Sequence, residues 1–183
     1  MLEDIEKLNT IWTIGHSTRA IKEFVELIVS NGVRQILDVR TVPRSRHNPQ
    51  FNLDELPLSL AKYGIDYKHL AGLGGLRHSQ KDSINLGWRN ASFRGYADYM
   101  QTDNFGDSLA EMMEIATRIP SALMCAEIVP WRCHRSMIGD ALLVRRVEVL
   151  DIISQAEPMP HRLTPFAKVD GTVITYPPEA SES

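Results

Sequence analysis

Short apolar segments alternate with amphipathic helical segments along this 183-residue chain, and this alternation constrains its fold more than any other feature. The apolar segments are continuous runs rather than alternating apolar and polar residues, which is typical of strands buried on both faces. We therefore predict an α/β fold with three layers, in which helices cover both faces of a mainly parallel sheet. A small C-terminal hairpin is expected within residues 162–176, around Asp170-Gly171.

The expected strands and helices follow one another from the first residues to the last third of the chain. The strands are predicted at residues 11–16, 34–39, 66–70, 121–127 and 148–153. The helices are predicted at residues 20–31, 53–63, 95–101, 105–118 and 134–146. Residues 71–94 contain four glycines and show no clear periodicity. A loop of that length inside a compact domain is usually functional or mobile.

Length and composition are those of a single globular domain, which we assign to residues 1–176. Residues 177–183 are predicted to be a disordered tail. No run approaches the roughly 18 apolar residues that a membrane span needs, so no membrane partner is expected. The acidic start MLEDIEKLN lacks an apolar signal core, which predicts a cytoplasmic protein whose cysteines, Cys125 and Cys133, are thiols.

Positive charge is concentrated in three segments, although the net charge is −3. Residues 40–50 and 77–94 each carry +3 and residues 130–135 carry +2, while the rest of the chain carries −11. Arginine outnumbers lysine 14 to 6, and a guanidinium binds carboxylates and phosphates in a bidentate manner. The pattern predicts a localised anion-binding site on an acidic body, although arginine-rich loops are also found simply solvated.

Chemically distinctive residues come at the ends of the predicted strands. They are His16, Ser17, Asp38, Arg40, His69, Cys125 and Glu127, with Cys133-His134-Arg135 opening the helix after the fourth strand. Ligands of parallel sheets bind beyond the carboxyl ends of the strands. We therefore expect these residues to converge on one edge of the sheet.

Cys133 is predicted to lie near the N-terminus of a helix, among Arg132, His134 and Arg135. A helix N-terminus and neighbouring cations both stabilise a thiolate, and they also attract anions. Cys133 is therefore a candidate nucleophile, with an ordinary small residue at a helix start as the alternative.

Glu127 and Cys125 are two residues apart on a predicted strand and would share one face. Glu127 is a candidate general acid or base, or a structural partner for an arginine of residues 40–46. For Cys125 a buried core thiol is the simpler interpretation.

Six segments have specific lengths and spacings. They are TIGHSTR at 13–19, DVRTVPRSRHNPQFN at 38–52, LGGLR at 73–77, WRNASFRGYADYM at 88–100, CAEIVPWRCHRSMI at 125–138 and PHRLTPFA at 160–167. On these segments the chain resembles the domain of unknown function 488 family. The resemblance implies a compact α/β domain and a site built from the segments, but it implies no reaction, substrate or cofactor.

We predict an enzyme of unassigned reaction that acts on an anionic, phosphate-bearing substrate such as a nucleotide or a nucleic-acid component. Cys133, Glu127 and His134 are the expected catalytic residues. The expected anion-binding residues are His16, Ser17, Asp38, Arg40, Arg44, Arg46, His47, Arg89, Asn90, Arg94, Tyr96, Arg132 and Arg135. Cofactor and oligomeric state do not follow from the sequence.

Three alternatives use the same residues. In a nucleic-acid-binding module without catalysis, aromatics of residues 88–100 would stack on bases, although such modules are usually basic. In a metal-dependent hydrolase or redox enzyme, the ligands would be Cys125, Cys133 and His134, but their spacing is not diagnostic and we expect no metal. In a sulfurtransferase, Cys133 would carry the sulfur, because Asp38-Val39-Arg40 is similar to the Asp-Val-Arg of rhodanese-like domains.

Overall fold

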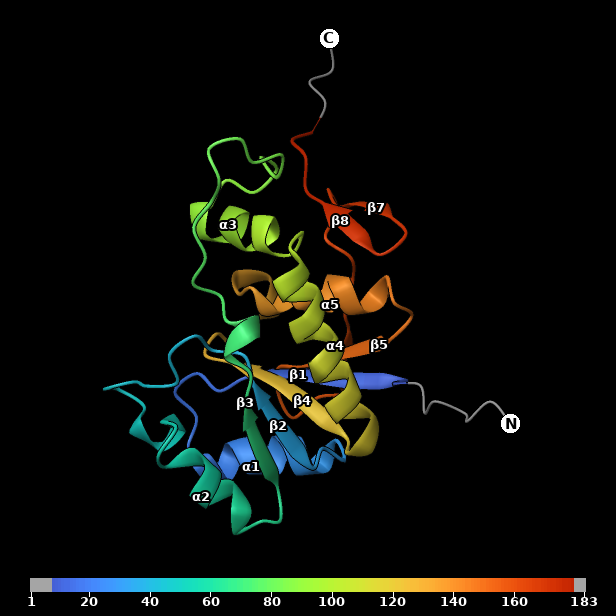
Figure 1. Ribbon diagram of the computed structural model, residues 1–183. Helices are drawn as coiled ribbons and strands as arrows, with labels where there is room; N and C mark the ends of the chain where they lie inside the picture. Colours follow the sequence, from blue (N-terminus) through green and yellow to red (C-terminus); the bar gives the residue numbers. More distant parts are fainter. Residues whose placement is uncertain (1–7, 180–183) are drawn as a thin grey trace.

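A six-stranded sheet forms the centre of the protein in a computed structural model that describes residues 8–179 (Figure 1). The strands are β1 (Thr10–Gly15), β2 (Gln35–Asp38), β3 (Asp66–His69), β4 (Ser121–Cys125), β5 (Glu148–Ile152) and β6 (Met159–Pro160). They lie in the order β3-β2-β4-β1-β5-β6, with β1 to β5 parallel and β6 antiparallel to β5. The predicted α/β class and mainly parallel sheet are confirmed, and the two-residue strand β6 was not predicted.

Five α-helices and three short 3-10 turns connect the strands. The helices are α1 (Ile21–Ser30), α2 (Leu56–Ala61), α3 (Ala91–Tyr99), α4 (Asp103–Arg118) and α5 (Arg135–Leu143). The turns are η1 (Pro49–Phe51), η2 (Ala71–Leu73) and η3 (Pro130–Arg132). The predicted C-terminal hairpin is confirmed as β7 (Lys168–Asp170) and β8 (Val173–Thr175), with Gly171 in the left-handed region at φ 60°.

Most predicted element boundaries differ from the observed ones by a few residues, and two of these differences have clear local reasons. Helix α3 begins before the predicted residue 95, because the Asn90 side chain accepts hydrogen bonds from the backbone N–H groups of Ser92 and Phe93 and caps the helix. Strand β4 ends at Cys125 rather than at Glu127, so the expectation that these two residues share one strand face is wrong.

Helices pack on both faces of the sheet and give two hydrophobic cores (Figure 1). One core joins α1 and α2 to the sheet through Phe24, Ile28, Leu60, Ile36 and Met124. The other joins α3, α4 and α5 through Tyr96, Met112, Ile138, Leu37 and Leu123. Because neighbouring residues of β2 and β4 face opposite cores, both faces of these strands are buried, as their continuous apolar runs predict.

Strands β1 and β4 are neighbours at the centre of the sheet, and the chain leaves them in opposite directions. After β1 it enters α1 on one face, and after β4 it enters α5 on the other face. Such a reversal opens a crevice beyond the carboxyl ends of the two strands, where α/β proteins bind ligands.

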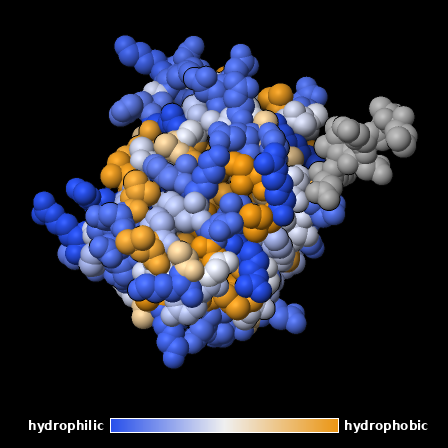
Figure 2. Space-filling model, turned by 60° about the horizontal axis from the view of Figure 1, so that its bottom comes forward, coloured by the Kyte–Doolittle hydropathy of each residue, from blue (hydrophilic) through white to orange (hydrophobic). Residues whose placement is uncertain are grey.

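None of the helices within residues 8–179 combines the length and the apolar character needed to cross a bilayer. On the face that Figure 2 turns forward, hydrophobic residues lie interspersed with hydrophilic ones. Residues 180–183 of the predicted tail and residues 1–7 of the predicted domain lie outside the described residues.

A buried polar network fixes the segment after β5. The ring of His161 lies between two carboxylates, with Nδ1 3.1 Å from Asp151 and Nε2 3.0 Å from Asp140. The hydroxyl of Tyr176 donates to Asp140 at 2.9 Å. Burial lowers the pKa of His161, but the two carboxylates outweigh this effect and raise it to about 9. The imidazolium therefore holds the C-terminal segment against α5 and β5 at neutral pH.

This network predicts a loss of stability at alkaline pH. An unfolded histidine titrates near about 6.5, so between about 6.5 and 9 the folded state binds more protons than the unfolded state. The stabilisation is complete below this range and is lost as the pH rises through it, by an amount on the order of 2 kcal/mol. Urea unfolding of the wild type and of His161→Gln at several pH values checks this. The difference between their free energies of unfolding isolates the contribution of His161 from that of other titrating groups. A difference in stability that does not shrink from pH 6.5 to 9.5 would contradict it.

Candidate functional site

A cavity of about 610 Å³ opens at the carboxyl ends of β1, β2 and β4. Its wall includes eight residues that the sequence analysis had named for catalysis or anion binding, namely His16, Ser17, Arg40, Arg44, Glu127, Arg132, Cys133 and His134. Cys125 also reaches this cavity, although it belongs to the core as well. These strand-end residues therefore lie together at one edge of the sheet, as we expected.

Three side chains form a compact cluster in the cavity wall. The Nδ1 atom of His134 lies 3.5 Å from Sγ of Cys133 and 4.0 Å from Sγ of Cys125. The two sulfurs and a nitrogen of His134 all lie within 4.8 Å of one another. Cys125 comes from the end of β4 and the other two from the segment that opens α5, so the cluster joins two separate elements.

The imidazole of His134 is held in one orientation. Its Nε2 lies 2.9 Å from the carbonyl oxygen of Val39 at the end of β2. A carbonyl only accepts hydrogen bonds, so Nε2 carries the proton of the neutral ring, and Nδ1 presents its lone pair to the two sulfurs. The ring of Tyr96 packs against the imidazole at a centroid distance of 4.9 Å, and its hydroxyl donates to the carbonyl of Leu73.

Gly75 also lies against the imidazole of His134. A Cβ atom at this position would lie 2.5 Å from Nδ1 of His134, which is shorter than any real carbon contact. Because His134 is buried and hydrogen-bonded, the ring has little room to move away. A residue without a side chain is therefore needed where the loop after η2 crosses the cluster.

We expect Gly75→Ala to displace the imidazole and to cost about 1–3 kcal/mol of stability, as overpacking in a core usually does. Gly106→Ala is the matched control, because nothing lies within 4 Å of the added Cβ on α4. That substitution is expected to stabilise the helix by about 0.5–1 kcal/mol. Urea unfolding measures both, and equal stabilities of the two variants would show that the imidazole is not confined.

The two thiols influence each other's proton affinity. Their mutual hydrogen bond lowers the pKa of Cys125 and raises that of Cys133. Burial opposes the change at Cys125, whereas His134 and Arg135 support it. The backbone N–H of Arg135 donates to Sγ of Cys133 at 3.4 Å. The sequence analysis placed the activated thiol at Cys133, whereas the electrostatics of the pair favour a thiolate at Cys125.

Arg40 reaches the cavity, but four of the five N–H donors of its guanidinium already have partners. Its guanidinium and its backbone N–H hydrogen-bond to the buried carboxylate of Asp38, with the shortest distance 2.6 Å. It also donates to the carbonyl of Phe51 at 2.7 Å and to Nε2 of His16 at 3.2 Å. Burial lowers the pKa of Arg40, and the hydrogen bonds and charge of Asp38 outweigh this and raise it. Of the arginines at residues 40–46 that were considered as partners for Glu127, Arg40 is thus paired with Asp38 instead.

His16 is a neutral support of this ion pair. Its Nε2 accepts from Arg40, and its Nδ1 donates to the carbonyl of Ser17 at 2.8 Å. Burial lowers the pKa of His16, and the charge of Arg40 lowers it further. The next residue, Ser17, has a left-handed backbone with φ 48°, which turns the chain along the cavity wall.

A family model described as "Domain of unknown function DUF488" matches residues 20–142. The chain belongs to the DUF488 family. The match includes Cys125, Cys133, His134 and all three cationic segments, whereas the similar segments at 13–19 and 160–167 lie outside it. No curated protein and no solved structure matches the chain.

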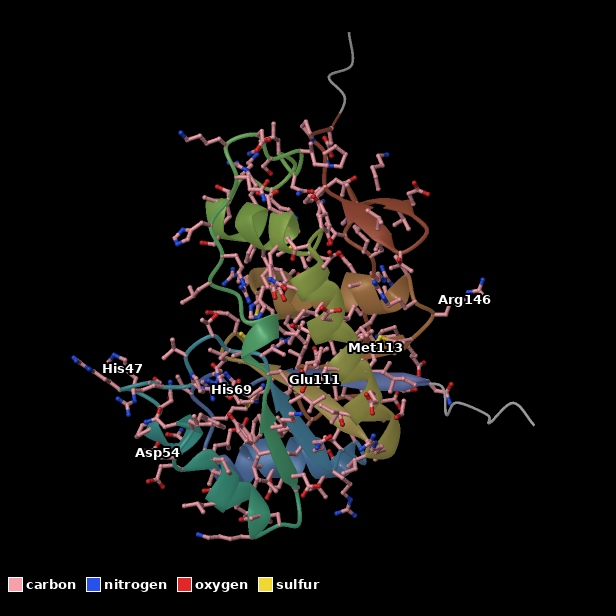
Figure 3. All side chains as sticks on the ribbon, viewed as in Figure 1. His47, Asp54, His69, Glu111, Met113 and Arg146 are labelled. Carbon is pink, nitrogen blue, oxygen red and sulfur yellow. The ribbon has the colours of Figure 1, made fainter. Side chains whose placement is uncertain are left out.

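The anion-binding residues expected in this DUF488 chain separate into two groups. Arg44 and Arg132 are exposed on the cavity wall, and no hydrogen bond or ion pair joins either guanidinium to a residue within 8–179. Arg46 and His47 are exposed on the same loop but do not line the cavity, and His47 points away from the body of the molecule (Figure 3). The free cationic groups of the cavity are therefore those of Arg44 and Arg132.

Four further expected residues have structural contacts in the DUF488 chain, and a fifth lies apart. Asn90 caps α3, Arg94 donates to the carbonyl of Trp88, and Tyr96 packs on His134. Arg135 is buried and donates to the carbonyls of Glu127 and Ile128. Arg89 is exposed and does not line the cavity. The arginines of segment 77–94 thus do not join those of the other two segments.

Glu127 combines a fixed backbone with an exposed side chain on the cavity wall. Its carbonyl accepts from Arg135 and packs so closely on Gly15 that a Cβ there would lie 1.7 Å from the oxygen. These main-chain contacts fix the backbone of Glu127 beside the cavity.

Sequence reasoning missed several cavity residues, namely Thr18, Thr41, Val42, Ser45, Asn48, Gly75, Leu76, Ser92 and Ala126. Phe93 also lines the cavity and had been considered only as a possible stacking or core residue. The glycine pair in LGGLR was the available signal for Gly75, because glycine often marks a close backbone approach.

Proposed function

We propose that this DUF488 protein is an enzyme that acts on an anionic, phosphate-bearing substrate, a nucleotide or a nucleic-acid component, through its two thiols. One observation carries the proposal: the cluster of Cys125, Cys133 and His134 opens onto the same cavity as the unpaired guanidiniums of Arg44 and Arg132. Arginine suits phosphate because its planar donors bind two oxygens at once. A reactive group and an anion-binding group thus face one bound molecule.

The geometry supports a distinct role for each group. His134 offers the lone pair of Nδ1 at 3.5 Å from Cys133 and 4.0 Å from Cys125, so it is the base that takes a thiol proton. The sulfur then attacks the phosphorus of the substrate, the bond between phosphorus and the leaving oxygen breaks, and Glu127 on the same wall donates a proton to that oxygen. Water then attacks the phosphorus with Glu127 as base, which breaks the sulfur–phosphorus bond, releases the product and restores the sulfur. Arg40, His16 and Asp38 hold the wall in shape rather than bind the anion.

The limited size of this cavity favours an enzyme over a nucleic-acid-binding module. A module that follows a strand needs a cationic path along successive phosphates, whereas Arg44 and Arg132 flank one cavity of about 610 Å³. Turnover of a nucleotide or phosphate ester by the reduced protein supports the enzyme. Salt-sensitive binding of a polynucleotide without turnover would support the module instead.

The arginines provide a direct test. Arg44→Gln and Arg132→Gln are each expected to weaken binding of a nucleoside monophosphate about 10- to 100-fold, because a hydrogen bond to a charged group contributes about 1.5–3 kcal/mol. Arg46→Gln is the matched control, since Arg46 lies on the same loop but outside the cavity wall. Isothermal titration calorimetry with nucleoside monophosphates and inorganic phosphate measures the affinities. Equal losses in all three variants, or no binding by the wild type, would refute the proposal.

A further inference from the structure

We propose that Cys125, Cys133 and His134 bind one Zn²⁺ ion and leave its fourth coordination position open to the cavity. The ion is inferred from the arrangement of these three side chains alone. Its effect on thiol chemistry, described below, rests on the proposed function.

The distances in the cluster are those of a tetrahedral zinc site. With Zn–S about 2.3 Å and Zn–N about 2.0 Å, ligand atoms of a tetrahedron lie about 3.5–3.8 Å apart. The two sulfur-to-nitrogen distances are 3.5 Å and 4.0 Å, and the whole set lies within 4.8 Å. Shifts of no more than about 1 Å would therefore complete the site.

The surroundings orient the ligands as they do in metal sites. A histidine that ligates zinc commonly donates its other ring N–H to a carbonyl or carboxylate, and the Nε2 of His134 donates to the carbonyl of Val39. Tyr96 and Gly75 both contact the ring and confine it. The backbone N–H of Arg135 donates to Sγ of Cys133, an interaction that stabilises a thiolate ligand. The lone pair of Nδ1 is thus directed at the position of the ion.

The donor set selects the kind of metal. Two sulfurs and one imidazole nitrogen suit zinc rather than magnesium or calcium, which prefer oxygen ligands. Two thiolates neutralise the charge of Zn²⁺, so the site needs no carboxylate. Structural zinc sites have four protein ligands, whereas three ligands and an open position are typical of zinc that binds water or an anion. Both cysteines line the cavity that contains Arg44 and Arg132, so the open position faces it.

Zinc binding and thiol attack exclude each other, which makes the ion a regulator of the proposed thiol chemistry. Each cysteine gives up its proton to solvent on binding, and the lone pair of its sulfur then forms a bond to the metal. Neither sulfur remains free to attack a substrate, and the Nδ1 lone pair of His134 is also occupied. Removal of the ion restores the cluster described above.

Cobalt is the spectroscopic probe for this site. The reduced, chelator-treated full-length protein is titrated with Co²⁺, which should bind at one equivalent with a thiolate-to-cobalt charge-transfer band and the visible bands of tetrahedral Co²⁺. Zn²⁺ should displace it and abolish both. His47→Ala is the control, an exposed histidine outside the cavity wall, and should bind as the wild type does. Cys125→Ser and Cys133→Ser each keep one thiolate ligand, so each should show at most about half of the charge-transfer band and bind at least about 10-fold more weakly.

Alkylation separates this inference from the proposed function. One equivalent of Zn²⁺ should protect both thiols from iodoacetamide, as measured by intact-protein mass spectrometry, whether or not any phosphate compound is turned over. A folded protein that shows no cobalt–thiolate band, or thiols that stay equally reactive with zinc, would overturn the zinc site and leave the thiol enzyme possible. Zinc binding by a protein that binds no phosphate compound would overturn only the proposed function.

Discussion

Asp38→Ala is expected to lower the free energy of unfolding by about 3–5 kcal/mol, because it leaves the charge of Arg40 buried without its counter-ion. Asp38 is fully buried and Arg40 is only 7% exposed. The carboxylate also accepts from the hydroxyl of Tyr67 at 2.6 Å, so the substitution also removes the partner of a half-buried donor. Urea unfolding followed by circular dichroism measures the loss.

An exposed ion pair of the same chemistry is the control for this prediction. Glu114 and Arg118 form a salt bridge on α4 in which each side chain is 70% exposed. Glu114→Ala is expected to change stability by less than about 1 kcal/mol. The double variant Asp38→Ala with Arg40→Met should recover a substantial part of the loss, since it removes the unpaired charge. If Asp38→Ala cost no more than Glu114→Ala, the buried pair would not be what secures the cavity wall.

Serine in place of either cysteine is expected to reduce turnover of the phosphate compound on which the wild type acts by at least about 100-fold. Serine has nearly the size of cysteine, but its hydroxyl keeps its proton at neutral pH and is a far weaker nucleophile. The two sulfurs share one imidazole, with Nδ1 of His134 within 4.0 Å of each. Both thiols are therefore expected to matter, and kcat of the metal-free, reduced protein measures the effect.

The double variant shows whether the two thiols act as one unit. When two groups act as one unit, removal of the second after the first has little further effect on the rate. The double variant Cys125→Ser with Cys133→Ser should therefore have a kcat only slightly below that of the slower single variant. Urea unfolding of each variant separates a loss of activity from a loss of folded protein. Full turnover by both folded single variants would remove the thiols from the reaction.

The architecture could be predicted from the sequence because its signals are local. Continuous apolar runs such as SALMC of β4 mark strands buried on both faces, and the helices between them enforce parallel pairing. Parallel pairing then places every strand end at one edge, which is why the residues after β1, β2 and β4 meet in one cavity. The position of the cavity thus followed from residue order before any contact was known.

The roles within the cavity depend on contacts that no local signal encodes. Nothing near Arg40 in the sequence shows that Phe51 and His16 also use its donors, so it was expected to bind the anion rather than support the wall. Cys125 reads as a core residue because it ends an apolar strand, and its second role appears only when α5 brings His134 beside it. Likewise, Arg94 and Arg135 were expected in the site, but they bond to nearby carbonyls instead.

The partner that orients His134 is the main-chain carbonyl of Val39, not a side chain. Any residue at position 39 has the same main-chain oxygen, so no single substitution there removes the hydrogen-bond acceptor. Side-chain changes at this position therefore leave the orientation of the imidazole unchanged. The orientation of the His134 ring therefore depends on the register of β2 beside β4 and not on which amino acid occupies position 39. The sheet itself thereby fixes the direction of the Nδ1 lone pair of His134, whatever residues form the surrounding loops.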